Sequence, residues 1–516
     1  MKTVESILRT TTTLHHPSSA NDSAGELKRG AFSNAIAVLA SNFRSIFTFL
    51  VARLLGPEVL GIYMVAWATT DIISRIGLLA LDTTIMTFIA RSEAVSDRAR
   101  SRSLFHIAVL VVVLQCTLLA VIAILVIRLS GGWFGLHPEM IAALSVMLCA
   151  IPGVALYRMG TAVSRGMKVM RHDIFSRGIT DSFVTTIAFL AMVGFGFRTF
   201  APEVALIIGS AASGVVAFIL ASTLFRSAPR SDPPISFRGE ARRLFAFAAP
   251  ISAYELVNTA ISRLDVIMLA CFIGRAPGVT LAMVGVYGTV VEVGSGLRKV
   301  NQAFNPIFGP IVAGMTVHGE QERAAATFSR VTQWMLWILL PLVAVMALAG
   351  PVILGIYGPI FRQGSTWLTI VAIGCATNAF VGLAETVIMV QRPRLNLFNS
   401  AITFVIALVA NVWLIGNFGV TGAAFGILLP YVILGILRYR TLRLVFRWRN
   451  PWANAGWPLL AAVLAGAPAI ASRAIIDGAA GQVIASAVFA VIYFIVWRRR
   501  RAVEARQPST SQMTSL

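Results

Sequence analysis

The chain has 516 residues, of which 57% are hydrophobic and only 13% are charged. Since soluble domains carry about 25% charged residues, this composition indicates a polytopic membrane protein and excludes an ordinary soluble domain. The net charge of +21 does not predict nucleic-acid binding, because nearly all basic residues lie in short loops or at the ends of apolar segments.

Apolar segments long enough to cross a bilayer follow one another along most of the chain. Such a span needs about 20 mostly apolar residues. Fourteen spans are predicted, at residues 31–54, 58–88, 104–128, 138–160, 178–197, 202–225, 242–273, 280–312, 330–350, 365–390, 395–416, 419–438, 455–473 and 480–497. Residues 1–29 and 501–516 are polar and are predicted to be disordered cytoplasmic tails.

The basic residues test this count, because cytoplasmic loops carry an excess of Lys and Arg. With a cytoplasmic N-terminus, every loop that should be cytoplasmic carries several arginines, and Arg158 and Arg438 are counted among them. The loops on the other side carry about one each, namely Arg53, Arg128, Arg198, Arg275, Arg362 and Arg473. The alternation never inverts, so both termini are predicted to be cytoplasmic.

An internal match relates the two parts of the chain. ARLLGPEVLGIYMVA at 52–66 resembles ACFIGRAPGVTLAMVGVYGTV at 270–290, with Gly61-Ile62-Tyr63 aligned on Gly285-Val286-Tyr287. An offset of six spans is even, so the halves would be parallel repeats about an axis along the membrane normal, with a site at their interface. Chance matching of Gly and Tyr in apolar sequence could also produce this internal match.

The predicted fold is therefore an all-α polytopic membrane protein of about fourteen transmembrane helices. Two pseudo-symmetric six-helix lobes, at 30–225 and 242–440, surround a central cavity and are joined by a cytoplasmic linker at 226–241. Residues 441–500 form two additional helices. The four cysteines lie within spans without metal-ligand spacing, so neither a disulfide framework nor a metal site is predicted.

Charged residues inside the spans collect in two stretches, 44–82 and 255–299. A charge at the bilayer centre costs roughly 2.5–3.5 kcal/mol. Nine charges facing lipid would cost on the order of 25 kcal/mol, so they must face one another or a watery cavity. The nine are Arg44, Asp71, Arg75, Glu255, Arg263, Asp265, Glu292, Arg298 and Lys299. This distribution is typical of a transporter.

Three strings resemble a known family. ARLLGPEVLGIYMVAWATTDIISRIGLLALDTTIMTFIAR at 52–91 is similar to the opening helices of the polysaccharide-transporter branch of the MOP superfamily, the bacterial oligosaccharide flippases. LGIYGPIFRQGSTWLTIVAIG at 354–374 resembles that family's connection between helices nine and ten, and GVTGAAFGILLPYV at 419–432 resembles the start of helix twelve. The resemblance implies two bundles that open alternately to either side, and a lipid-diphosphate substrate carrying a short glycan.

Five cations are predicted to line the cavity and hold the diphosphate or acidic sugars. Arginine binds such groups in a bidentate way and lysine acts as a point charge. The five are Arg44, Arg75, Arg263, Arg298 and Lys299. Two other interpretations remain open: Arg75 could pair with Asp71 one helical turn earlier, and Arg298 and Lys299 could snorkel to the cytoplasmic interface.

Four carboxylates are candidates for ion coupling, because an acid inside the membrane can carry a proton or help to bind Na⁺. They are Glu255, Asp265, Glu292 and Glu385. The alternative is that they are fixed counter-ions of Arg263 or Lys299. Transport would then be driven by an ion gradient or the membrane potential, with no cofactor and no catalytic residue.

The predicted function is the translocation of polyprenyl-diphosphate-linked oligosaccharide across the bacterial inner membrane, for O-antigen, exopolysaccharide or capsule synthesis. Membrane lipids, a polysaccharide polymerase and glycosyltransferases are the expected partners, and nucleic acid is not. The alternative is a cation-coupled small-molecule antiporter of the multidrug type. An integral-membrane enzyme is disfavoured, because the outer loops are mostly short and no Asp-x-Asp or P-loop motif is present.

Overall fold

The computed structural model describes residues 44–133, 136–169, 171–226 and 237–506. The described chain folds into helices and turns, and ten of its helices are long and apolar enough to cross a membrane. The predicted N-terminal tail, the first part of span one and most of the linker lie outside the described residues. Residues 501–506, predicted as part of the C-terminal tail, belong to the last helix, which ends at Arg506, and the rest of that tail lies outside the described residues.

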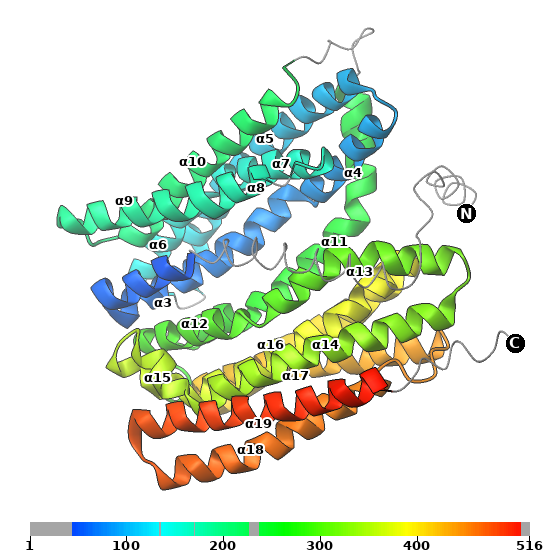
Figure 1. The fold of residues 1–516 in the computed structure, drawn as a ribbon. Coiled ribbons are helices and arrows are strands. Elements are labelled where there is room, and N and C mark those ends of the chain that lie inside the picture. Colours follow the sequence, from blue (N-terminus) through cyan, green and yellow to red (C-terminus); the bar gives the residue numbers. More distant parts are fainter. Residues whose placement is uncertain (1–43, 134–135, 170, 227–236, 507–516) are drawn as a thin grey trace, which may run out of the picture.

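The first half of the molecule comprises α3–α10, which pack together in the upper part of Figure 1. These elements are α3 (Arg44–Leu78), α4 (Leu81–Ala94), α5 (Arg98–Ser130), α6 (Pro138–Leu148), α7 (Ile151–Gly166), α8 (Arg171–Asp173), the π-helix η2 (Ile174–Asp181), α9 (Ser182–Gly194) and α10 (Ala201–Thr223). Predicted span four is divided into α6 and α7, and span two ends in α4 after a turn at Leu79 and Ala80.

The second half comprises α11–α19, of which α11 runs between the two halves in Figure 1. These elements are α11 (Phe237–Cys271), α12 (Leu281–Ser295), α13 (Arg298–Val317), α14 (Gln321–Leu348), α15 (Gly350–Gly355), η3 (Pro359–Gly364), α16 (Ser365–Gln391), α17 (Pro393–Leu444), η4 (Ala453–Ala455), α18 (Gly456–Ile475) and α19 (Gly478–Arg506). Predicted span eight is divided into α12 and α13.

Two of the long helices contain a break at a glycine. Gly56 in α3 has φ 89° and ψ 177°, and Gly419 in α17 has φ 56° and ψ −131°, conformations that interrupt a helix and favour glycine. A straight helix as long as α17 would measure about 78 Å, more than twice the thickness of the hydrocarbon core. The breaks lie at the predicted turns between spans one and two and between spans eleven and twelve.

The halves meet where α3 packs against α11 and α12. At the crossing of α3 and α12, a Cβ on Gly61 would meet the carbonyl of Leu281 and the amide of Gly285. Conversely, a Cβ on Gly285 would meet the carbonyl of Pro57 and the amide of Gly61. The contact is thus reciprocal, and its two glycines are the pair that the internal sequence match aligns.

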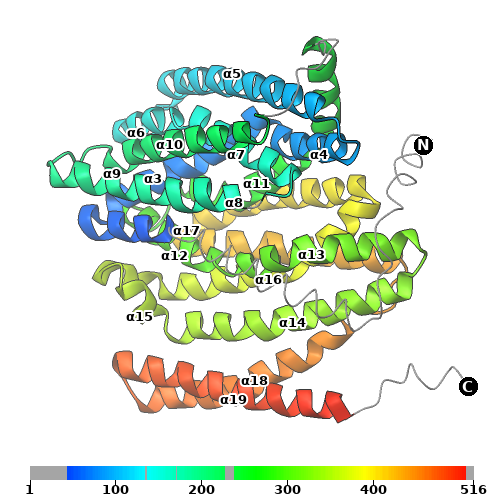
Figure 2. The same cartoon turned by 45° about the horizontal axis from the view of Figure 1, so that its top comes forward.

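Helices α18 and α19 pack against each other and against α14. Figure 2 shows them along one edge of the molecule, on the far side of the second half from α5. Small residues of α18, including Ala461 and Ala465, are buried in a cluster with Phe489 and Tyr493 of α19. The two helices are therefore an addition to the second half.

Candidate functional site

Asp71 of α3 is the centre of an ion-pair cluster between the halves. Its Oδ1 accepts a hydrogen bond from Nη2 of Arg158 at 3.1 Å, and its Oδ2 accepts one from Nε of Arg263 at 3.1 Å. Arg158 lies on α7 and Arg263 on α11, so one carboxylate joins three helices. The Asp71 side chain is only 13% exposed, and the two guanidinium groups offset the cost of burying its charge.

Arg75, one helical turn after Asp71, pairs across the same interface with Glu255 of α11. Nη1 of Arg75 lies 3.0 Å from Oε2 of Glu255 and 3.9 Å from Oδ2 of Asp82. The hydroxyl of Thr83 donates to the other oxygen of Glu255 at 3.0 Å. Arg75 therefore does not form the pair with Asp71 that the spacing favoured, and the oxygens of Asp71 accept from Arg158 and Arg263 instead.

We call the residues Asp71, Arg75, Asp82, Arg158, Glu255 and Arg263 the central cluster. Arg75 and Arg263 are 29% and 28% exposed although they lie in membrane-spanning helices. Ionised groups do not face hydrocarbon, so this accessible surface is expected to face water between the halves. Nε of Arg75 and Nη1 of Arg158 are buried without a hydrogen-bond partner among the described residues. The cluster therefore has unused donors.

Glu385 belongs to a separate group inside the second half. Its Oε2 accepts from Nη2 of Arg438 at 3.0 Å, and its Oε1 accepts from the hydroxyl of Tyr254. Arg438 is fully buried, with a relative exposure of 0%. This ion pair joins α16 to α17, and the tyrosine adds α11. Glu385 is thus held as a counter-ion in this conformation.

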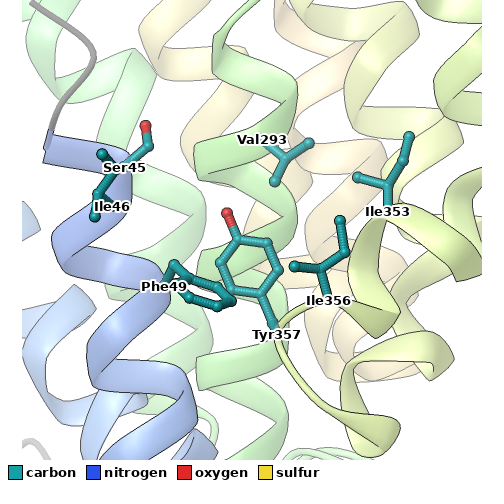
Figure 3. Close-up of a pocket in the computed structure, with 7 residues that line it drawn as sticks. All are labelled: Ser45, Ile46, Phe49, Val293, Ile353, Ile356 and Tyr357. Atoms are coloured by element: carbon teal, nitrogen blue, oxygen red, sulfur yellow. The ribbon is translucent and has the colours of Figure 1, made fainter.

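Glu292 of α12 lies where α12 faces the beginning of α3, and the hydroxyl of Ser45 donates to its Oε1 at 3.3 Å. Beside it, a mostly apolar pocket of about 430 Å³ opens between α3, α12 and the segment around α15 (Figure 3). Its lining residues are Ser45, Ile46, Phe49, Val293, Ile353, Ile356 and Tyr357. Lys299, on α13, is partly exposed.

Asp265 and Arg298 lie in a further group of the second half. Oδ2 of Asp265 is 2.7 Å from the hydroxyl of Tyr287 on α12. The guanidinium of Arg298 lies over the ring of Tyr431 on α17, 5.7 Å from its centroid. Neither residue forms an ion pair within the described chain.

The structure thus distributes the predicted site residues among several groups. Arg75, Arg263 and Glu255 come together in the central cluster, whereas Glu385, Asp265 with Arg298, and Glu292 lie in the separate surroundings described above. The side chain of Arg44 lies outside the described residues. Their roles in substrate binding and ion coupling stay predictions.

Sequence reasoning missed Arg158 and Arg438, which it assigned to cytoplasmic loops. A signal was present, because both residues lie within the last three positions of predicted spans, where a charge in a loop cannot be told from a charge that faces the protein interior. Tyr254 and Tyr287 were missed for a different reason: a buried tyrosine in an apolar helix has no sequence pattern that reveals a carboxylate partner.

A protein-family model described as "Polysaccharide biosynthesis protein" matches residues 27–307. The chain belongs to this family. The match covers the first half, the linker, α11 and α12, and therefore includes every member of the central cluster. No curated protein sequence matches the chain.

Solved structures of MATE transporters share the fold of this polysaccharide-family chain. A multidrug-resistance MATE family transporter of the MOP superfamily, solved in an inward-facing conformation, is 13% identical with a TM-score of 0.68, covering 80% of this chain and 98% of its own. The Vibrio cholerae MATE transporter VcmN is 16% identical with a TM-score of 0.61, and the match covers 84% of this chain and 99% of VcmN. The eukaryotic MATE transporter AtDTX14 is 11% identical with a TM-score of 0.62, and the match covers 86% of this chain and 99% of AtDTX14.

These similarities confirm the prediction of an all-α polytopic membrane protein and the resemblance to the MOP exporters. The chain is thus a multi-pass membrane protein of the polysaccharide biosynthesis family, and its fold is the one seen in solved MATE transporters.

Proposed function

We propose that this protein is a flippase that moves polyprenyl-diphosphate-linked oligosaccharide from the cytoplasmic to the outer leaflet of the bacterial inner membrane. Both termini would be cytoplasmic, and a polymerase and glycosyltransferases of surface-polysaccharide synthesis would be its partners. The family assignment supports a role in polysaccharide synthesis. The observation that carries the mechanism is that Arg75 and Arg263, suited to bind a diphosphate, join the two halves through carboxylates.

Charge balance in the central cluster gives substrate binding a mechanical consequence. Three arginines face three carboxylates, so the cluster is neutral without substrate. A diphosphate that binds Arg75 or Arg263 must therefore displace Glu255 or Asp71, or bind together with a proton or another cation. Either event breaks ion pairs between α3 and α11. Binding of the anion would thus loosen one interface between the halves, as alternating access requires.

The unpaired donors of the cluster are hydrogen-bonding capacity that an anion could use once the ion pairs between the halves open. Nε of Arg75 and Nη1 of Arg158 are buried without a partner among the described residues, and an unsatisfied buried donor costs about 1–3 kcal/mol. Phosphate oxygens could accept from these donors and would compete with the carboxylates of the cluster for the arginines. Coupling to an ion gradient or to the membrane potential would supply the energy for directional transport.

The test is the sidedness of lipid-linked oligosaccharide in cells that lack the gene, measured together with surface polysaccharide. We expect precursor trapped on the cytoplasmic side and loss of surface glycan. Complementation with Arg75→Ala should fail, while Arg53→Ala, changed at an exposed site on the same helix, should restore both. Normal sidedness with normal surface glycan in the deletion strain would reject the proposal.

The second candidate is a cation-coupled exporter of small molecules, which the similarity to MATE transporters of multidrug resistance favours. The two functions differ in what Arg75 does. In an exporter of cationic drugs the arginine would repel the substrate, whereas in the flippase it holds the diphosphate. Drug or metabolite efflux that depends on the gene, with unchanged surface glycan, would therefore select the exporter.

A further inference from the structure

Asp265 is a buried carboxylate whose side-chain partner is a tyrosine, and it forms no ion pair with an arginine among the described residues. It lies on α11 with a relative exposure of 1%. Its Oδ2 is 2.7 Å from the hydroxyl oxygen of Tyr287 on α12, and the same hydroxyl is 2.9 Å from the backbone carbonyl of Ala423 on α17. Oδ1 of Asp265 has no hydrogen-bond partner among the described residues.

The hydrogen atoms in this chain of oxygens can be counted. A tyrosine hydroxyl has a single hydrogen, while a carbonyl and an ionised carboxylate can only accept. If Asp265 were ionised, Tyr287 could donate to Asp265 or to Ala423, and one of the two close contacts would hold no hydrogen. A proton on Oδ2 satisfies both contacts: Asp265 donates to Tyr287, and Tyr287 donates to Ala423. The geometry is therefore that of a protonated carboxylic acid.

The charges around Asp265 do not remove the need for this proton. Arg263 precedes it on α11 and is bound to Asp71 of α3, and Arg298 on α13 lies over the Tyr431 ring of α17. Neither arginine forms an ion pair with Asp265 in the described chain. From α16, Cys375 is buried beside Arg298 and brings no fixed positive charge. An ionised Asp265 would be a buried charge without an ion-pair partner among the described residues, which costs several kcal/mol.

We propose that Asp265 is a reversible proton-binding site, occupied in this conformation and emptied when α12 moves relative to α11 and α17. On release the O–H bond of Asp265 breaks, the proton passes to water, and the electron pair stays on the carboxylate. Arg298, the cation on the neighbouring helix α13, then becomes the available counter-ion. This deepens the proposed function, because it assigns to one residue the ion that drives transport.

The position of Tyr287 connects the proton to the motion of the halves. Tyr287 follows Gly285 by two residues on α12, and Gly285 touches the backbone of α3 at Pro57 and Gly61. A change in the crossing of α3 and α12 therefore displaces the hydroxyl that lies between Asp265 and Ala423. Opening of the α3–α12 crossing and release of the proton from Asp265 would therefore occur together.

Infrared difference spectroscopy of the purified full-length protein tests the proposal without any substrate. The carbonyl-stretch band of a protonated carboxylic acid at neutral pH should be present in the wild type and lost in Asp265→Asn. Asparagine can donate to Tyr287 as the protonated acid does, so this variant should keep the wild-type unfolding temperature. In Tyr287→Phe the band should move, because its hydrogen-bond acceptor is removed.

Asp71→Asn is the matched control, since Asp71 is ionised between two arginines and its replacement should remove an ionised carboxylate band instead. Loss of an ionised carboxylate band in Asp265→Asn, with the protonated-acid band unchanged, would overturn the proposal. The measurement is independent of glycan transport. A protonated Asp265 in a protein that moves no lipid-linked oligosaccharide would reject the flippase assignment while keeping the proton site.

Discussion

At the residue scale, two carboxylates of the central cluster, Asp71 and Glu255, each join three helices. Asp71 joins α3 to α7 and α11, and Glu255 joins α11 to Arg75 of α3 and Thr83 of α4. Removing one such acid leaves arginines unpaired inside the membrane-spanning region. That is more costly than the loss of the same pair at a surface.

Asp71→Asn should lower the free energy of unfolding by about 3 kcal/mol, because breaking a buried ion pair costs about 3–5 kcal/mol and this site is partly accessible. The unfolding temperature in detergent measures the effect. Glu320→Gln removes a carboxylate from an exposed pair with Arg323 and should cost less than about 0.5 kcal/mol. Equal effects of the two changes would show that the cluster contributes no stability.

His172, outside the membrane-spanning segments, should make stability depend on pH. Its ring is buried, with Nδ1 3.0 Å from the hydroxyl of Ser164, and burial together with Arg171 lowers its pKa below the ordinary 6.5. The unfolded chain therefore binds the proton more readily. The contribution of His172 is complete above pH 6.5 and is lost as the pH falls below that value.

Unfolding temperatures measured above and below pH 6.5 test this expectation. His172→Gln should reduce the drop in unfolding temperature at low pH. His137→Gln, changed at an exposed position, should show the same drop as the wild type. An unchanged pH dependence in His172→Gln would contradict the argument.

Sequence alone could show which charges lie inside the spans, because their cost in lipid is independent of the fold. It could not show their partners. Arg75 pairs with Glu255, which is 180 positions away in the chain, and not with Asp71, which is one helical turn away. Such a choice depends on how α3 and α11 are packed, and no local spacing contains that information.

At the scale of elements, the crossing of α3 and α12 depends on the absence of side chains. Gly61 and Gly285 bring the two backbones together, and each would place a Cβ against the carbonyl that lies four residues before the other glycine. This is the geometry expected of close helix crossings in membranes. The sequence match aligned these glycines, although nothing in it revealed that they would touch.

Gly285→Ala should reduce the free energy of unfolding by about 1–3 kcal/mol, because its methyl group would overlap the carbonyl of Pro57 and overpacking of this kind is destabilising. Gly466→Ala is the matched control on α18, where an added Cβ meets nothing within 4 Å. That change should be neutral or stabilising, since alanine is the better helix former. Denaturation in detergent compares the two variants.

The breaks in α3 and α17 were predictable as turns, because apolar length limits a span and glycine marks its end. The internal divisions of spans two, four and eight were not. Leu79 and Ala80 both have positive φ, which is uncommon in residues with side chains, and packing must hold them there.

At the scale of the whole molecule, two of the contacts between the halves differ in character. The α3–α12 crossing is tight and apolar, whereas the central cluster is charged and partly accessible. Composition and periodicity were sufficient to predict an all-α membrane protein. The relative placement of the halves required the structure, because it depends on contacts between segments 180 or more positions apart in the chain.

A disulfide across the tight interface should stop transport if the halves must separate there. A Cβ on Gly288 would lie 3.0 Å from Cβ of Met64, so the two helices need to separate by less than about 1 Å to reach the spacing of about 3.8 Å in disulfides. In a background without the four native cysteines, oxidised Met64→Cys/Gly288→Cys should lose transport and regain it on reduction.

Gly160→Cys/Ala217→Cys is the control for this cross-link, because it joins α7 to α10 within the first half. It should leave transport intact when oxidised. Transport that survives the oxidised link between Met64 and Gly288 would show that this crossing stays closed throughout the cycle.

Helices α18 and α19 make the two halves unequal in the bilayer. Their main contacts outside the pair and the adjacent η4 are with α14 and α15, so they are attached to the second half alone. The second half therefore presents a longer perimeter to the lipid and displaces more of it when it turns. If the halves rock against each other, the first half should rotate by the larger angle relative to the membrane, and the second half should move less.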